Sequence, residues 1–84
     1  MNGNPLQAML DFLLALEARG MFHRLSRVRA EALMVEVAIP GERWEVEFFA
    51  DGHVETERFV AAGGVQGDPA TLDLLLARGS EGET

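Results

Sequence analysis

The stretch VEVAIPGERWEVEFFADGHVETE, residues 35–57, decides the fold of this chain. Just before it and into its first part, residues 32–39 alternate between apolar side chains and mixed ones, which is typical of a half-buried β-strand. Pro40 and Gly41 then predict a tight turn into a second strand. With these two residues at the centre of the turn, core residues face core residues across the hairpin: Val37 and Trp44, Val35 and Val46, and Leu33 and Phe48.

The next connection, residues 50–52, allows two registers for the following strand. A two-residue Asp-Gly turn places carboxylates opposite core residues, although it gives Glu45 the partner Arg58. A three-residue loop that closes on a glycine bulge avoids this conflict and requires a positive φ at Gly52. We favour the three-residue loop, because its register gives apolar or small partners to the core: Phe48 with Val54, and Val46 with Thr56.

In the favoured register the outer face of the sheet carries glutamates on three strands, with Glu45 opposite Glu57 and Glu47 opposite Glu55. Like charges directly opposite each other destabilise a sheet by about 0.2–1 kcal/mol per pair. Either arginines and salt screen this repulsion or the face serves to bind a partner. The arginines expected to screen it are Arg43 and Arg58. The candidate protein-binding residues are Glu36, Glu45, Glu47, Glu55 and Glu57, with Met34 and Phe49 as apolar anchors among them.

A helix is predicted before these strands, over residues 5–19. Asn4 is a suitable N-cap, Pro5 a suitable first helical residue, and Gly20 a suitable residue just past the end. The apolar arc of this helix is wider than the single stripe of a surface helix. The residues that widen it are Phe12, Leu14 and Leu16. We favour burial of the whole arc in a small core over exposure to a partner.

Two further elements complete the prediction. Residues 22–28 have no strict alternation and are interpreted as an irregular edge strand, whose arginines discourage aggregation. A short C-terminal helix is expected over residues 69–78, with Asp68 as its cap and Gly79 past its end. The fold is therefore expected to be α+β: a four-stranded antiparallel meander with both helices packed on one face. It forms one domain, residues 1–79, followed by a disordered tail, residues 80–84.

Composition excludes several classes of protein. The 84 residues include no cysteine, so disulfides and thiolate metal sites are absent and the default location is cytoplasmic. Asp11 and Glu17 interrupt the first apolar segment, which speaks against a signal peptide or a membrane span. The net charge of -7 repels nucleic-acid phosphates, and only the strip of Arg24, Arg27 and Arg29 departs from this balance.

Candidates for chemistry are few. The chain has no tyrosine and no lysine. Asp51-Gly52-His53 puts a carboxylate near an imidazole, but the predicted turn already accounts for the aspartate and the glycine. His23 is interpreted as a half-buried strand residue rather than an anion site. Glutamates spread over a flat sheet make a poor metal site, and the glycine-rich residues 63–67 lack the lysine of a phosphate-binding loop. We therefore expect that the chain is not an enzyme and that it binds no cofactor, no metal and no small-molecule ligand.

The segment VEVAIPGERWEVEFFADGHVETERF, preceded by a leucine-rich helix and HRLSRVR, is similar to a set of short bacterial proteins. These share a V-P-G-E-R-W-E-V-E-F signature, an Asp-Gly turn and a Val-Glu-x-Glu strand. The likeness covers most of residues 9–60 and departs at Ile39, where valine is expected, and after Val60. It implies a bacterial intracellular protein and brings no established activity or catalytic residue.

Two hypotheses for function follow. The first is a small acidic protein-binding module, comparable to an immunity protein, an antitoxin or a nuclease inhibitor, whose glutamate face covers a basic protein partner. The alternative is a structural or assembly protein that forms a homodimer, either through its surplus helix leucines or through the arginine strip against the acidic face of a second copy.

Overall fold

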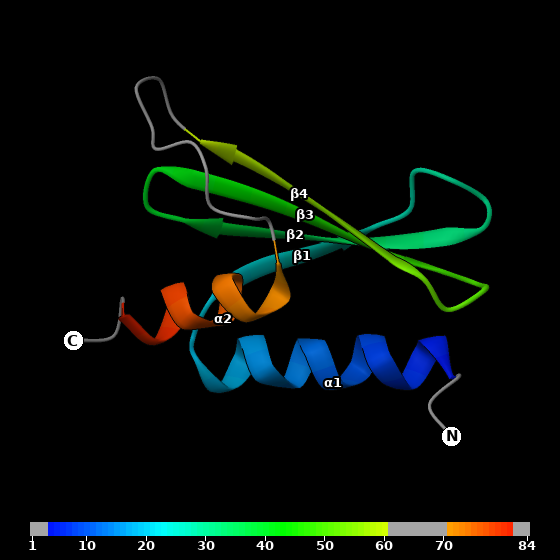
Figure 1. Ribbon diagram of the computed structural model, residues 1–84, viewed down its shortest axis with the longest axis horizontal. Coiled ribbons are helices and arrows are strands. Elements are labelled where there is room, and N and C mark those ends of the chain that lie inside the picture. Colours follow the sequence, from blue (N-terminus) through cyan, green and yellow to red (C-terminus); the bar gives the residue numbers. More distant parts are fainter. Residues whose placement is uncertain (1–3, 61–70, 82–84) are drawn as a thin grey trace.

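The computed structural model describes residues 4–60 and 71–81, and in these residues two helices cover one face of a four-stranded sheet (Figure 1). The strands are antiparallel and neighbours in sequence are neighbours in space, in the order β1-β2-β3-β4. The predicted α+β meander is confirmed. The elements are α1 (Pro5–Ala18), β1 (Phe22–Ser26), β2 (Ala32–Ile39), β3 (Glu42–Phe49), β4 (Val54–Val60) and α2 (Leu72–Glu81).

Helix α1 begins and ends where its capping residues predict, to within one residue. The side chain of Asn4 accepts hydrogen bonds from the backbone N–H groups of Leu6 and Gln7, at 3.0 and 3.2 Å. At the other end Gly20 takes a φ of 65°, and its N–H donates to the carbonyl of Glu17. The residues that the helix buries against the sheet are Met9, Phe12 and Leu16.

The three hairpin registers place the core on the helix side of the sheet. The β2–β3 pairs expected from the Pro-Gly turn are all present, with Val37 opposite Trp44. Trp44 has no exposed surface, so its predicted burial is confirmed. The edge strand β1 ends at Ser26, two residues earlier than predicted. The fully buried side chains are Trp44, Leu16, Leu75, Val35, Val37 and Val46.

The β3–β4 connection is the three-residue loop. The backbone N–H of Phe49 donates to the carbonyl of His53 at 3.0 Å, and the N–H of Gly52 donates to the carbonyl of Phe49 at 2.9 Å. Phe48 lies opposite Val54, and Gly52 has a φ of 98°, as predicted. The alternative register, with Glu45 opposite Arg58, is therefore excluded, because Glu45 faces Glu57.

The second helix differs from its prediction in both bounds. It starts at Leu72, where the hydroxyl of Thr71 accepts the N–H of Leu74 at 3.2 Å, and it continues to Glu81. Gly79 lies within the helix rather than past its end, because a glycine costs a helix only about 1 kcal/mol. The predicted cap Asp68, the first helical residue Pro69 and most of the tail lie outside the described residues.

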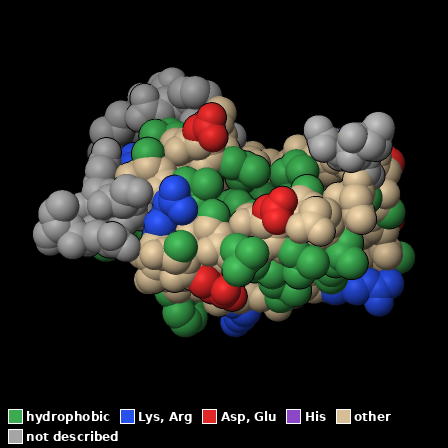
Figure 2. All heavy atoms as spheres, turned by 90° about the horizontal axis from the view of Figure 1, so that it is seen from below, with side chains coloured by type: hydrophobic (Ala, Val, Ile, Leu, Met, Phe, Trp, Pro, Cys, Tyr) green, Lys and Arg blue, Asp and Glu red, His purple; other side chains and the backbone are tan. Residues whose placement is uncertain are grey.

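Helix α2 closes the core beside α1. Leu75 is fully buried, and Leu72, Leu74 and Leu76 pack against the core. Arg19 joins the two helices, since its Nε donates to the carbonyl of Leu76 at 3.2 Å. Neither helix of the described ranges is long and apolar enough to cross a membrane. Seen from the side of α1, apolar side chains remain at the surface (Figure 2).

The loop geometry predicts a strong asymmetry between two neighbouring substitutions. Gly52→Val meets no nearby atom, but it forces a branched side chain to a φ of 98°, a strain of about 1–3 kcal/mol. Asp51→Ser keeps an oxygen that can accept the backbone N–H of His53, so its cost is expected to be well under that of Gly52→Val. Urea unfolding followed by circular dichroism measures both, and equal midpoints would contradict the loop described here.

Candidate protein-binding surface

The outer face of the sheet, which no helix of the described residues covers, brings the predicted glutamates together. Glu45 lies opposite Glu57, Glu47 opposite Glu55, and Glu36 opposite Glu45. Four of these five glutamates line a hollow of about 380 Å³, which we call the acidic hollow; Glu36 lies outside it. The residues that line the acidic hollow are Arg29, Met34, Glu45, Glu47, Glu55, Thr56 and Glu57.

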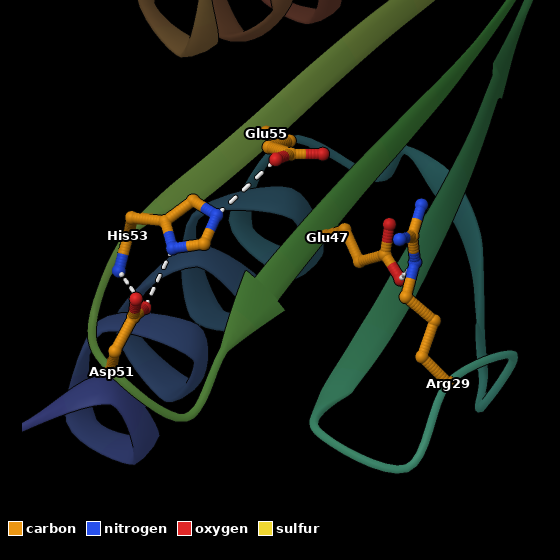
Figure 3. A network of polar contacts seen from close by, with 5 residues as sticks. All are labelled: Arg29, Glu47, Asp51, His53 and Glu55. Carbon is orange, nitrogen blue, oxygen red and sulfur yellow. Dashed lines mark hydrogen bonds and ion pairs between the residues drawn. The ribbon is translucent and has the colours of Figure 1, made fainter.

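Glu47 forms the buried part of this hollow. Its side chain is only 8 % exposed, and the Nε of Arg29 donates to its Oε2 at 3.0 Å (Figure 3). Arg29 comes from the β1–β2 connection, and its guanidinium also lies 5.6 Å from the centre of the Phe49 ring. The pair satisfies a carboxylate that would otherwise be costly to bury. Sequence reasoning missed this contact, because Arg29 lies outside every strand.

Two further arginines stand beside Glu36 and Glu45. Arg24 contacts Glu36 at 2.7 Å, across β1 and β2, and Arg43 lies 3.6 Å from Glu45. Screening of the acidic face therefore comes from Arg24, Arg29 and Arg43. The expectation that Arg58 contributes is wrong, because the register places it opposite Trp44 on the helix side.

At the end of the hairpin, His53 links two carboxylates. Its Nδ1 lies 2.6 Å from Asp51 and its Nε2 3.2 Å from Glu55, and the ring stacks on Phe49 with centres 4.1 Å apart (Figure 3). The hydrogen bond to Asp51, followed by that to Glu55, raises the pKa of His53 above its usual 6.5. The pKa of Asp51 is lowered, chiefly by the backbone N–H of His53. His53 therefore holds its positive charge to a higher pH than a free imidazole.

The predicted apolar anchors do not project from this surface. Met34 is 8 % exposed and forms part of the floor of the acidic hollow. Phe49 is 7 % exposed, because the ring of His53 stacks on it and Arg29 extends over it. The exposed side chains of this face are therefore mainly the other carboxylates and the arginines beside them.

The charges of the acidic hollow do not balance. Glu57 is exposed and makes no ion pair within the described part of the chain, and the contact of Glu45 with Arg43 is long and solvated. Carboxylate oxygens accept hydrogen bonds best from guanidinium and ammonium groups. Within residues 4–60 and 71–81 no group of three or more acidic or histidine side chains is arranged to hold a metal ion. The hollow is thus suited to a cationic side chain.

A second polar cluster, which sequence reasoning missed, lies on the helix side of the sheet. Glu42 and Arg58 have side chains only 4 % and 7 % exposed, with a shortest contact of 3.1 Å. Trp44 Nε1 donates to Glu42 at 2.8 Å, and Arg78 of α2 also contacts this carboxylate. Burial raises the pKa of Glu42, but the hydrogen bonds from Arg58 and Trp44 and the charge of Arg78 outweigh it, so that its pKa is lowered. We call these residues the Glu42 network.

The Glu42 network ties β3, β4 and α2 together around the only tryptophan. The predicted register contained the signal for it, since Arg58 opposite Trp44 must lie on the core face.

Comparisons of the chain with protein-family models, with curated proteins and with solved structures find no match.

Proposed function

We propose that this chain is a small acidic protein-binding module that binds a basic protein through its outer sheet face. Arginine or lysine side chains of the partner enter the acidic hollow, and the glutamates around it contact the surrounding basic surface. An immunity protein, an antitoxin or a nuclease inhibitor acts in this way when it covers the surface with which a basic enzyme holds nucleic acid. The role is one of binding, with no reaction at the hollow.

The observation that carries the proposal is the direct opposition of glutamates on β3 and β4. Glu45 faces Glu57 and Glu47 faces Glu55, at a hollow whose one lining cation is Arg29 among the residues described. Opposed carboxylates weaken a sheet, and a solubilising surface needs only scattered charges, not opposed ones. Arg29 and His53 compensate Glu47 and Glu55 within the chain, whereas the pair of Glu45 and Glu57 has only the long contact of Glu45 with Arg43, so this pair is where a partner supplies the missing cation.

The geometry also suits a planar guanidinium better than an ammonium. A guanidinium donates in a fork that two carboxylate oxygens accept together, and the hollow offers carboxylates from two neighbouring strands. Inside the chain a guanidinium already donates to this face, since the Nε of Arg29 donates a single hydrogen bond to Glu47. Long-range attraction by the remaining charges raises the association rate, an effect that salt suppresses.

A double substitution separates recognition from stability. Glu45→Gln with Glu57→Gln keeps the size of both side chains and removes one opposed pair of charges. The free energy of unfolding is expected to stay unchanged or to rise by about 0.2–1 kcal/mol, because the repulsion is relieved. The affinity for the partner is expected to fall at least about tenfold. Urea unfolding and isothermal titration at low and moderate salt measure the two quantities.

The partner for this titration is the protein captured by the immobilised chain from an extract of its source cells and identified by mass spectrometry. Glu31→Gln with Asp73→Asn is the matched control, because both residues are exposed, lie off the acidic hollow and carry the same total charge. The control should bind as the unmodified chain does. Unchanged affinity of the Glu45 and Glu57 variant would reduce the face to a solvated surface.

A further inference from the structure

Helix α1 leaves a row of leucines at the surface. Leu6, Leu10 and Leu14 are 57 %, 43 % and 63 % exposed and recur every four residues; we call them the leucine stripe. Arg19, which contacts α2, lies about 180° around the helix from Leu10. The stripe is therefore on the flank of α1 that α2 leaves open. Figure 2 views the molecule from the side of α1 and shows apolar side chains at the surface there.

We propose that the leucine stripe is the interface of a homodimer, in which two copies of α1 pack antiparallel about a two-fold axis at Leu10. A symmetric interface must be complementary to itself. The stripe meets this demand, since the axis places Leu10 against Leu10 and Leu6 against Leu14 of the second copy. Rows of residues four apart are also the ridges that most often interlock between helices.

An apolar hollow at one end of the stripe gives the second copy a specific place to dock. This hollow, of about 430 Å³, lies between the beginning of α1 and the sheet, and Leu6, Met9, Leu33 and Phe48 are among its lining residues. The two-fold axis brings Leu14 of the second copy beside Leu6, at the rim of this hollow. Leu14 is the most exposed of the three leucines, and inserting it into an apolar hollow gives the dimer its largest gain of buried surface.

Charge supports the antiparallel arrangement. Glu17 lies on the same flank beyond Leu14, is exposed, and has no ion pair within residues 4–60 and 71–81. In the dimer it stands beside the first turn of α1 in the second copy, where the positive end of the helix dipole favours a negative charge. Arg27 of the second copy offers a positive charge at the same end of α1. It lines the apolar hollow there and makes no ion pair within residues 4–60 and 71–81.

The homodimer leaves the acidic hollow of each copy free, because the leucine stripe and the acidic hollow lie on opposite sides of the sheet. The inference is therefore independent of the proposed function. If both hold, the assembly presents two acidic hollows to its partner and gains affinity from bivalent binding.

Sedimentation velocity of the purified chain tests the dimer without any partner. We expect a dimer that forms with rising concentration and is indifferent to salt, because apolar contacts hold it. Leu10→Glu places two carboxylates at the two-fold axis and should give a folded monomer at the same concentrations. Ala8→Glu is the matched control: it lies on the same helix, exposed, about 160° away from Leu10, and should remain dimeric.

The absence of cysteine from the chain allows a second, covalent readout. Leu10→Cys should form an intermolecular disulfide on mild oxidation, because the two-fold axis brings the two thiols together, whereas Ala8→Cys should not. A native chain that stays monomeric up to about 1 mM overturns the proposal. A dimer that survives Leu10→Glu also overturns it. A dimer that dissociates in high salt overturns it as well, because that result assigns the interface to the arginine strip and the acidic face.

Discussion

Trp44→Ala is expected to remove most of the stability of the fold, so that the chain unfolds in mild denaturant at room temperature. The side chain has no exposed surface and lies at the centre of the core, opposite Val37 on β2 and Arg58 on β4. Truncating a buried aromatic residue costs about 3–5 kcal/mol, because the cavity closes only in part. Small domains are stable by only about 5–15 kcal/mol, and this one is near the lower end in size.

Trp44→Phe is the matched control for that change. It keeps an aromatic ring in the core and loses the bond in which Nε1 donates to Glu42 at 2.8 Å. A smaller loss is expected, of about 1–2 kcal/mol. Far-UV circular dichroism in a urea titration reads both variants without needing tryptophan fluorescence. Equal stability of Trp44→Ala and the native chain would contradict the placement of the core, and all samples need the same protein concentration if the chain dimerises.

The hairpins were predictable because their signals are local. Alternation fixes which side chains share a face, and the Pro-Gly turn sets the β2–β3 register by itself. The choice at residues 50–52 followed from a single exclusion, that carboxylates do not face Phe48 and Val46 in a core. Gly52, with its φ of 98°, and Glu45 opposite Glu57 confirm that choice.

The missed features depend on long side chains and on how far one element covers another. Arg29 reaches Glu47 from a connection whose path no pattern describes. For α1, the periodicity of apolar residues identifies a wide apolar side of the helix, but the sheet and α2 cover only part of that side. Phe12 and Leu16 are buried as favoured, while Leu14 is exposed. The start of α2 differs from the prediction because Thr71 is also a residue type that caps helices, and its hydroxyl accepts the N–H of Leu74.

Arg58→Met is expected to cost about as much as truncating the tryptophan. The substitution keeps an unbranched apolar stem but leaves the buried carboxylate of Glu42 without the more deeply buried of its two cations. Breaking a buried ion pair from one side costs about 3–5 kcal/mol, because the remaining charge stays desolvated. Arg78 still contacts Glu42 from α2, so the lower end of this range is expected.

Removing the charge from both partners provides the control. Glu42→Gln together with Arg58→Met leaves no buried ion, and the amide can still accept the Trp44 N–H, so this double variant should recover much of the stability that Arg58→Met alone loses. A double variant as unstable as the sum of its single changes would show that Arg58 acts through packing alone. Urea midpoints for the four proteins give the coupling directly.

The same network predicts how stability depends on pH. The folded chain holds the pKa of Glu42 below its usual 4.5, so this group contributes stability that is fully present above about pH 4.5 and is lost as the pH falls through the lower, folded-state value. Arg58→Met removes the first of the favourable contacts that lower this pKa. The difference in unfolding free energy between the native chain and Arg58→Met should therefore be largest near neutral pH and shrink in acid, once Glu42 is protonated in both. A difference that stays constant from neutral pH to strong acid would mean that the charge of Glu42 is not what Arg58 stabilises.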